Sequence, residues 1–269
     1  MNNKQDILPN FLGIGAQRSG TTWLDAMLRS HPQIGMPRDT KELMFFDCKY
    51  KSLDIKAYQS FFNGCSYSIH KSIGEITPGY LWTSPFNSGI YEFNEDRVNI
   101  PQRVHNDLGS DVKLLVVLRD PVKRAISAYL HHLSKNRINV KDSILDIGKR
   151  FGILHMGFYS KHLFHWMKHY PTDCFDISIH ENILEDREGY LKRTFDFLGV
   201  AKNYEVVGIN KNYGKRLPYK KTDDGILVNQ NKQDYLVVKS DEIKILKDIY
   251  MKEIEDLETM FDLDVSKWK

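Results

Sequence analysis

A glycine-bounded turn near the N-terminus has the residue types of an anion-binding site. It runs from Gly15 to Thr22 as Gly-Ala-Gln-Arg-Ser-Gly-Thr-Thr, with the glycine spacing of a nucleotide phosphate loop. Small residues let backbone N–H groups converge on an anion, and the helix dipole adds to the attraction. Thr21 stands where the NTPase signature has lysine, and a cation, Arg18, lies inside the turn. We therefore predict an anion site here, in preference to an ordinary strand-to-helix turn.

A second candidate for anion binding follows the apolar run Lys113–Leu118. Arg119 ends that run, and Asp120-Pro121 is a typical helix start with Asp as the N-cap. Ser127 would then lie about two turns into the helix. Its hydroxyl and the Arg119 guanidinium could both reach one phosphate at the sheet edge. Without the first motif, an ion-paired arginine and a surface serine would explain this pair equally well.

Strands and helices alternate around these residues. This alternation predicts an α/β fold, in which one P-loop-like domain over residues 1–269 has a central parallel sheet flanked by helices. Chemistry is expected in loops at the carboxyl ends of the strands. Apolar runs predict strands at Phe11–Gly15 and Lys113–Leu118, and a third strand is expected at Phe175–Ile179, after a helix. Helices are expected at Thr22–Leu28, Val122–Leu133, Phe158–His169, Arg187–Leu198 (closed by Gly199) and Asp241–Phe261, with Lys49–Ser110 and Ala201–Asp234 irregular.

Composition excludes several classes of protein. The 269 residues are 41% hydrophobic and 27% charged, as in ordinary globular proteins, and a net charge of +3 gives no case for nucleic-acid binding. No apolar stretch is long enough to cross a membrane and no secretory signal is recognisable, so a soluble cytoplasmic protein is expected. Cys48, Cys65 and Cys174 lack CxxC spacing, which indicates reduced thiols.

The two anion motifs together resemble those of sulfotransferases. Gln17–Leu24 is similar to the 5′-phosphosulfate loop of these enzymes, and Arg119–Ser127 is similar to their 3′-phosphate motif. The resemblance covers most of the chain. It implies that the co-substrate is 3′-phosphoadenosine-5′-phosphosulfate (PAPS), whose sulfuryl group moves to an acceptor hydroxyl. It also implies a set of PAPS-binding residues, namely Gln17, Arg18, Ser19, Gly20, Thr21, Thr22, Arg119 and Ser127.

A candidate general base lies in the segment Lys41–Asp47. The segment is similar to the Lys-Glu-x-x-Phe-Phe stretch of heparan-sulfate-type sulfotransferases, whose glutamate is the base. Carried over, Glu42 takes the acceptor proton in an in-line displacement, and Arg18 stabilises charge on the leaving phosphate. Burial beside Phe45 and Phe46 is expected to make Glu42 a stronger base. The alternative is that Lys41 and Glu42 are solvated surface charges.

One acceptor-side segment departs from the family pattern. Gly74–Tyr80 resembles a Glu-Lys-Thr/Ser-Pro-x-Tyr stretch, but Ile76 stands where many members have an acceptor-site lysine. Lys41 or Lys71 could supply the missing charge.

A basic loop is expected to close over the nucleotide. It contains Lys215 and Arg216 and resembles a Lys-Gly-Arg-containing loop of heparan-sulfate-type members, although a solvated surface loop is the alternative. No metal is expected, because a sulfuryl group carries less charge than a phosphoryl group. His162, His165 and His169 share a helix face but are expected to pack.

The sequence therefore favours a PAPS-dependent sulfotransferase acting on a hydroxyl, with a carbohydrate as the leading acceptor. A lipid-like or other small alcohol is the second acceptor class. A P-loop kinase or NTPase and a non-catalytic anion-binding module are the other functional classes, and Thr21 in place of lysine argues against the kinase. Oligomeric state is not predicted. Aromatic residues that would suit sugar rings, apolar alcohols or core packing are Tyr58, Phe61, Phe62, Tyr80, Trp82, Phe86 and Tyr91.

Overall fold

The computed structural model describes residues 7–83, 95–213, 217–230 and 232–269. The chain divides into two compact units. The sheet unit comprises Met1–Thr83, Asn94–Leu118 and Phe164–Tyr213, and the helical unit comprises Ser84–Phe93, Arg119–Leu163 and Gly214–Lys269. The expectation that residues 1–269 form one domain stays a prediction.

The sheet unit contains a five-stranded parallel sheet in the order β2-β3-β1-β4-β5. The register places Phe11 of β1 opposite Gly74 of β3 and Lys113 of β4. The predicted parallel α/β sheet is confirmed. The strands are β1 (Phe11–Gly15), β2 (Ile34–Gly35), β3 (Ser72–Ile76), β4 (Lys113–Leu118) and β5 (Phe175–Ile179).

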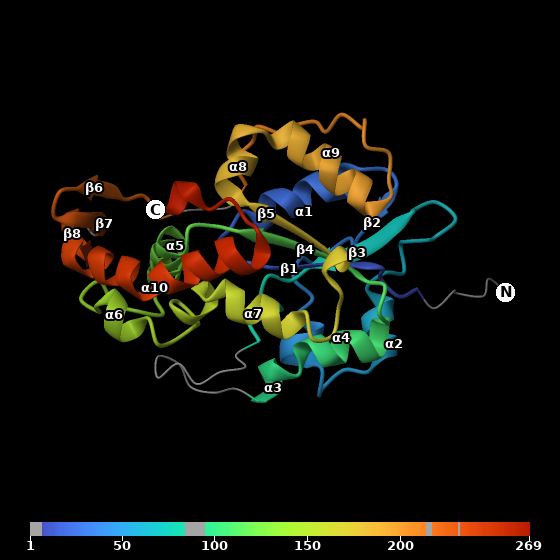
Figure 1. Cartoon of the computed structure of the whole chain (residues 1–269), viewed down its shortest axis with the longest axis horizontal. Helices are drawn as coiled ribbons and strands as arrows, with labels where there is room; N and C mark the ends of the chain where they lie inside the picture. The colour runs from blue at the N-terminus through green and yellow to red at the C-terminus, as the bar shows by residue number, and fades with distance from the viewer. Residues whose placement is uncertain (1–6, 84–94, 214–216, 231) are drawn as a thin grey trace. The chain divides into compact units, whose positions relative to one another are not determined.

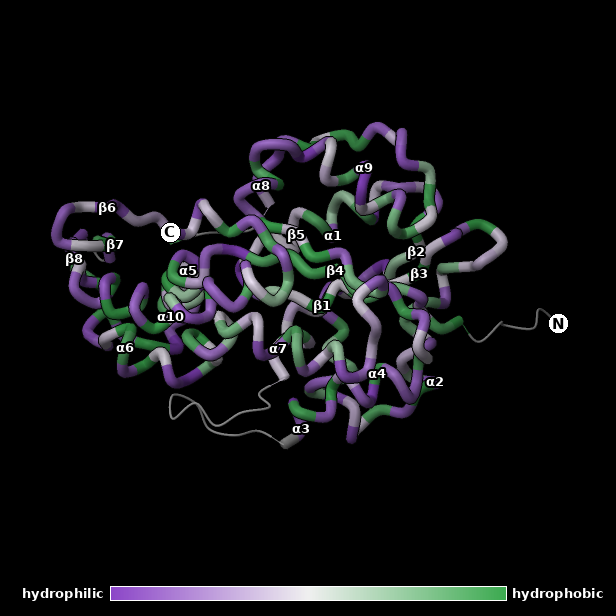
Figure 2. Tube along the Cα trace, in the orientation of Figure 1, coloured by the Kyte–Doolittle hydropathy of each residue, from purple (hydrophilic) through white to green (hydrophobic). Residues whose placement is uncertain are grey.

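Helices cover both faces of this sheet (Figure 1). One face carries α1 (Thr21–Ser30), α8 (His180–Glu185) and α9 (Arg187–Leu198), and the other carries α2 (Ile55–Ser60) and α4 (Ile100–Leu108). This layering explains why β1 and β4 are continuous apolar runs, since a strand covered on both faces has no side for solvent. Figure 2 shows the apolar colour along β4.

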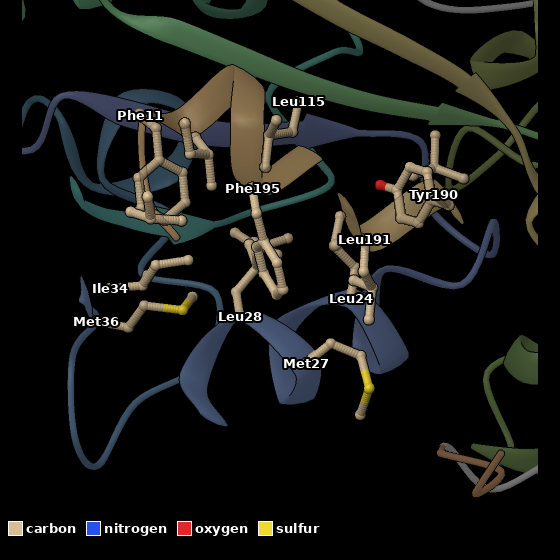
Figure 3. Packing of buried hydrophobic residues seen from close by; sticks show 14 of the residues in the cluster. Phe11, Leu24, Met27, Leu28, Ile34, Met36, Leu115, Tyr190, Leu191 and Phe195 are labelled. Atoms are coloured by element: carbon tan, nitrogen blue, oxygen red, sulfur yellow. The ribbon is translucent and has the colours of Figure 1, made fainter. Parts of the chain in front are cut away.

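The main core of the sheet unit lies between the sheet and the helices α1 and α9. Figure 3 shows Phe195 of α9 beside Leu28 of α1, and both side chains are buried. Each large apolar side chain removed from water in this way contributes roughly 1.5–3 kcal/mol. α9 ends at Leu198, and the predicted cap Gly199 follows with a φ of +75°, in the left-handed region. This packing fixes α1, and hence the turn that leads into it.

The helical unit is built on α5 (Pro121–Ser134) and α10 (Ser240–Phe261). It also contains an antiparallel sheet in the order β6-β7-β8, whose first two strands lie within the stretch Ala201–Asp234 that was expected to be irregular. Its strands are β6 (Lys220–Thr222), β7 (Gly225–Gln230) and β8 (Gln233–Lys239). The remaining elements of the chain are α3 (Glu95–Val98), α6 (Ile144–Ile147), α7 (Tyr159–Trp166), a π-helical turn η1 (Phe45–Lys49), and the 3-10 turns η2 (His155–Gly157), η3 (Thr172–Cys174) and η4 (Ser266–Trp268).

Two predictions from composition can be compared with the structure. All three cysteines are free, as expected for reduced thiols. Within the described part of the chain, no helix combines the length and the apolar character that crossing a membrane requires.

Candidate active site

The predicted anion turn joins β1 to α1. Ala16, the first residue after β1, donates a backbone hydrogen bond of 2.8 Å to the Val117 carbonyl oxygen of β4, which anchors the turn to the sheet. Gly20 is the N-cap of α1 with φ +96°, and a Cβ at this position would lie 2.9 Å from the His180 ring. Gly20 has no side chain to cap the helix, so the first N–H groups of α1 face the turn without a side-chain acceptor from the N-cap.

Ser19 supplies evidence that this turn is built for a ligand. Its side chain is fully buried, and its Oγ has no hydrogen-bond partner among the described residues. A buried hydroxyl without a partner costs about 1–3 kcal/mol. An anion at the N-terminus of α1 would accept a hydrogen bond from this hydroxyl, so the residues present fit a phosphosulfate group.

Lys41 connects the anion turn to the candidate base. Its ammonium Nζ donates to Thr22 Oγ1 at 2.9 Å and to Glu42 Oε1 at 3.1 Å. The structure thus brings together two motifs that the sequence placed separately. However, 43% of the Glu42 side chain is exposed, whereas Phe45 and Phe46 are buried. The expected burial of Glu42 is therefore wrong, because the two phenylalanines pack into the core and the carboxyl does not follow them.

The backbone around Glu42 has an unusual conformation. Glu42 has φ +61° and Met44 has φ +53°, both in the left-handed region that favours glycine. Each such residue costs about 1–3 kcal/mol unless its surroundings hold it. The segment then continues into η1. Interactions outside the segment must therefore stabilise this conformation.

A buried carboxyl lies beneath this segment. Glu75 of β3 is only 2% exposed, and burial raises its pKa to about 7 against the opposing effect of its hydrogen bonds. Thr77 Oγ1 donates to Glu75 Oε2 at 2.7 Å, and the Tyr80 hydroxyl donates to Oε1 at 2.8 Å. The sequence analysis gave Glu75 no role. The available signal was a carboxylate inside an otherwise apolar strand.

Ile76 lies on the opposite side of β3 from Glu75, as alternating residues of a strand must. It belongs to the buried core, and a Cβ added to Gly13 of β1 would lie 2.6 Å from the Ile76 side chain. The position where many family members have lysine is therefore a core position here.

Of the two lysines considered as substitutes, only Lys41 contacts the anion turn and the base. The Lys71 amide donates to the Gln33 carbonyl, and the Lys71 carbonyl accepts from Asn10 Nδ2 at 3.4 Å. Asn10 directly precedes β1, whereas the anion turn directly follows it. Lys71 therefore lies at the amino end of the strands, away from the turn.

Arg119 and Ser127 belong to the helical unit. The predicted helix start is confirmed: Asp120 Oδ1 caps α5 by accepting from the amides of Val122 (2.9 Å) and Lys123 (3.2 Å). The Tyr159 hydroxyl donates to the Arg119 carbonyl at 2.9 Å, which fixes that backbone. The part played by Arg119 and Ser127 in binding PAPS stays a prediction.

Several other candidates have structural explanations or cannot be placed. His162 and His165 each bond a backbone carbonyl, that of His155 at 3.1 Å and of Val98 at 2.8 Å. Across the described ranges, no three His, Cys, Asp or Glu side chains are arranged to hold a metal ion. Tyr58, Phe62 and Tyr80 are buried around Phe45 and Phe46, so they pack in the core and offer no face to a sugar. Lys215, Arg216, Phe86 and Tyr91 lie outside the described residues.

Comparison with known proteins gives one consistent result. A family profile described as the sulfotransferase domain matches residues 8–223. Heparan sulfate glucosamine 3-O-sulfotransferase 3B1 of Homo sapiens is 31% identical over 204 residues, which cover 72% of this chain and 47% of that protein. Membrane-associated sulfotransferase kil1 of Dictyostelium discoideum is 37% identical over 123 residues, covering 45% of this chain and 22% of that protein. The chain spans about half the length of the first curated relatives it matches.

A solved structure supports the fold. A sulfotransferase from Alicyclobacillus acidocaldarius matches with a TM-score of 0.72 at 21% identity, covering 97% of this chain and 99% of that one. The match therefore extends over elements of both units.

Proposed function

Because the chain belongs to the sulfotransferase domain family, we propose that it transfers the sulfuryl group of PAPS to an acceptor hydroxyl. The observation that carries this proposal is the hydrogen-bonded link from Thr22 through Lys41 to Glu42. It connects the N-terminal end of α1, which suits an anionic donor, to a carboxylate that can accept a proton.

The residues have distinct roles in the proposed reaction. Glu42 accepts the hydroxyl proton as the acceptor oxygen forms its bond to sulfur. The sulfur–oxygen bond to the 5′-phosphate breaks at the same time, and Arg18 with the N–H groups of the turn stabilises the charge on the leaving oxygen. Lys41 holds the Glu42 carboxylate towards the donor end and takes the place of the lysine absent at Ile76.

The nucleotide is bound by further residues in this proposal. Gln17, Ser19, Gly20, Thr21 and Thr22 surround the phosphosulfate, with Ser19 donating its buried hydroxyl. Arg119 and Ser127 bind the 3′-phosphate, and Lys215 and Arg216 close over the nucleotide.

A carbohydrate hydroxyl is the proposed acceptor. The names of the human relatives, which include glucosamine 3-O-sulfotransferases acting on heparan sulfate, support this choice. The Lys-Glu-x-x-Phe-Phe segment supports it as well. The expected cytoplasmic location stays a prediction, since one relative is named as membrane-associated.

Calorimetric titration tests the donor site. Adenosine 3′,5′-bisphosphate should bind the wild type, and Arg119→Ala should weaken binding at least about 10-fold, because a charge-assisted contact to phosphate contributes about 1.5–3 kcal/mol. Arg193→Ala removes an exposed arginine of α9 and serves as the control. Tight binding of magnesium-ATP that is indifferent to Arg119→Ala would instead indicate a kinase or NTPase.

Sulfuryl transfer to oligosaccharide and small-alcohol acceptors then tests the reaction. Glu42→Gln should lower kcat by about 100-fold or more with little change in bisphosphate binding, as expected for loss of a general base. An unchanged kcat in this variant would remove Glu42 from the mechanism.

A further inference from the structure

The Glu75 carboxylate is hydrogen-bonded to the backbone that follows Glu42, the candidate base, at one residue directly and at others through hydroxyl groups. The Leu43 amide donates a hydrogen bond to its carboxylate. The Thr77 hydroxyl donates to Glu75 Oε2 at 2.7 Å and accepts from the Met44 amide at 3.2 Å. The same carboxylate therefore holds the first two backbone amides after Glu42, one directly and one through the Thr77 hydroxyl.

Tyr80 extends the same arrangement by one residue. Its hydroxyl donates to Glu75 Oε1 at 2.8 Å and accepts from the Phe45 amide at 2.9 Å, with the Phe46 amide at 3.4 Å. The amides of three successive residues are thus linked to one buried carboxyl, the first directly and the next two through the Thr77 and Tyr80 hydroxyls.

The charge state of Glu75 sets the direction of these hydrogen bonds. An ionised carboxylate can only accept, so the hydroxyls of Thr77 and Tyr80 must each donate their single proton to it. Their lone pairs are then available to the backbone amides. A protonated carboxyl has one hydrogen to donate and a glutamine amide has two, and a hydroxyl that accepts such a hydrogen loses the acceptor for its own proton.

The segment needs such support because its conformation is locally unfavourable. Glu42 and Met44 both have left-handed φ values, and the Glu42 side chain is partly exposed rather than packed. Apart from the Lys41 contact, the backbone that follows decides where the Glu42 carboxylate lies.

We propose that Glu75 is a positioning residue that fixes the geometry of the candidate base. Its carboxylate holds the first backbone amide after Glu42 directly and the next two amides through the Thr77 and Tyr80 hydroxyls. This inference rests on the proposed function for its catalytic consequence. The hydrogen-bond arrangement itself can be tested without any activity.

The surroundings of Glu75 make this support sensitive to pH. The titratable groups that face it are the Asp47 carboxyl from η1, the Tyr58 hydroxyl from α2 and the Tyr80 hydroxyl. Burial and Asp47 raise the pKa of Glu75, and the pKa lies at about 7. As the pH falls through 7, the carboxyl gains a proton and the support for the segment weakens.

Amide hydrogen exchange measured by NMR tests the arrangement. Glu75→Gln should accelerate exchange at Leu43, Met44 and Phe45 by at least about 10-fold while α9 amides stay unchanged, because only local opening becomes easier. Thr77→Val should accelerate exchange only at the Met44 amide, and Tyr80→Phe should accelerate exchange most at the Phe45 amide. If Glu75→Gln does not fold, these two variants test the hydrogen-bond arrangement in its place.

Glu253→Gln is the matched control, because Glu253 is a second buried glutamate with a pKa of about 7 and lies on α10 of the helical unit. It should leave the three amides protected. Protection that survives Glu75→Gln, or that is lost equally in Glu253→Gln, would overturn the proposal.

Kinetics test the catalytic consequence. In Glu75→Gln, kcat should fall about 10- to 100-fold with the KM for PAPS within about twofold, because a misplaced base affects the chemical step. The wild-type kcat should fall as the pH drops through 7, and this dependence should disappear in Glu75→Gln but persist in Glu253→Gln. Equal losses of kcat in the two variants would contradict a positioning role.

If the wild type transfers no sulfuryl group, the proposed function fails, while the exchange experiment still decides the role of Glu75 in the backbone.

Discussion

Replacement of Glu253 by glutamine should change how the stability of the protein depends on pH. Glu253 of α10 is 2% exposed, and its carboxylate accepts hydrogen bonds from the Ser160 amide and from Ser160 Oγ, the latter at 2.9 Å. Burial raises the pKa of this carboxyl from 4.5 to about 7, although the two bonds from Ser160 act in the opposite direction. The folded protein therefore holds the proton more tightly than the unfolded chain does.

The sign and size of the effect follow from this shift. The stabilisation from the protonated carboxyl is fully present below pH 4.5 and is lost as the pH rises through 7. One pKa unit corresponds to about 1.4 kcal/mol, so the free energy of unfolding should fall by roughly 3 kcal/mol over this range relative to a residue that does not titrate. Glutamine keeps an oxygen to accept from the Ser160 amide and carries no charge at any of these pH values.

Urea unfolding of the wild type and Glu253→Gln at pH 5, 6, 7 and 8 measures this difference directly. Between pH 5 and pH 8 the wild type should lose roughly 2.5 kcal/mol of stability relative to the variant. Glu75 titrates in both proteins, so its contribution cancels. Glu255→Gln alters an exposed carboxyl of the same helix and should show no such trend. A stability difference between wild type and Glu253→Gln that stays constant with pH, or has the opposite sign, would refute the reasoning.

Three further outcomes are expected. Gly20→Ala should lower the free energy of unfolding by about 1–2 kcal/mol in thermal melts, because φ is +96° and the new Cβ would lie 2.9 Å from the His180 ring. Lys41→Ala should lower kcat for sulfuryl transfer, whereas Lys71→Ala should not; equal effects would contradict the assignment. Asp120→Ala should cost about 1 kcal/mol of stability in urea unfolding through loss of the α5 cap, and no change would show that the cap is dispensable.

The part of the fold that could be predicted from sequence is the part with continuous apolar runs. β1 and β4 have the predicted bounds because strands buried on both faces carry their own signal. β5 also has the predicted bounds, although four of its five residues are only partly buried. β3 was not predicted because Gly74 and Glu75 interrupt its apolar character, and its pairing with β1 and β2 makes it a strand. The β6–β7 hairpin was also not predicted, although Asp223-Asp224-Gly225 is a turn signal that could have revealed it.

The candidate site also has a part that could be predicted from sequence and a part that could not. The anion turn and the Lys41–Glu42 pair could be found because their residue types and spacing lie within short segments. The exposure of the Glu42 side chain could not be predicted from sequence, because it depends on a left-handed φ that no neighbouring residue type dictates. The hydrogen bonds that link the amides after Glu42 to Glu75, Thr77 and Tyr80 join segments about 30 residues apart, so only the folded chain brings them together.

The contact between Gly13 and Ile76 has a consequence for attempts to engineer acceptor choice. Introducing at Ile76 the lysine of the motif that this segment resembles would place a cation in the apolar layer between the sheet and α1, where no aqueous environment receives it. Grafting the acceptor preference of a relative therefore requires exchanging the strand together with its packing partners. A mutagenesis library aimed at new acceptors should keep Ile76 and Gly13 fixed and vary the exposed surface around Lys41.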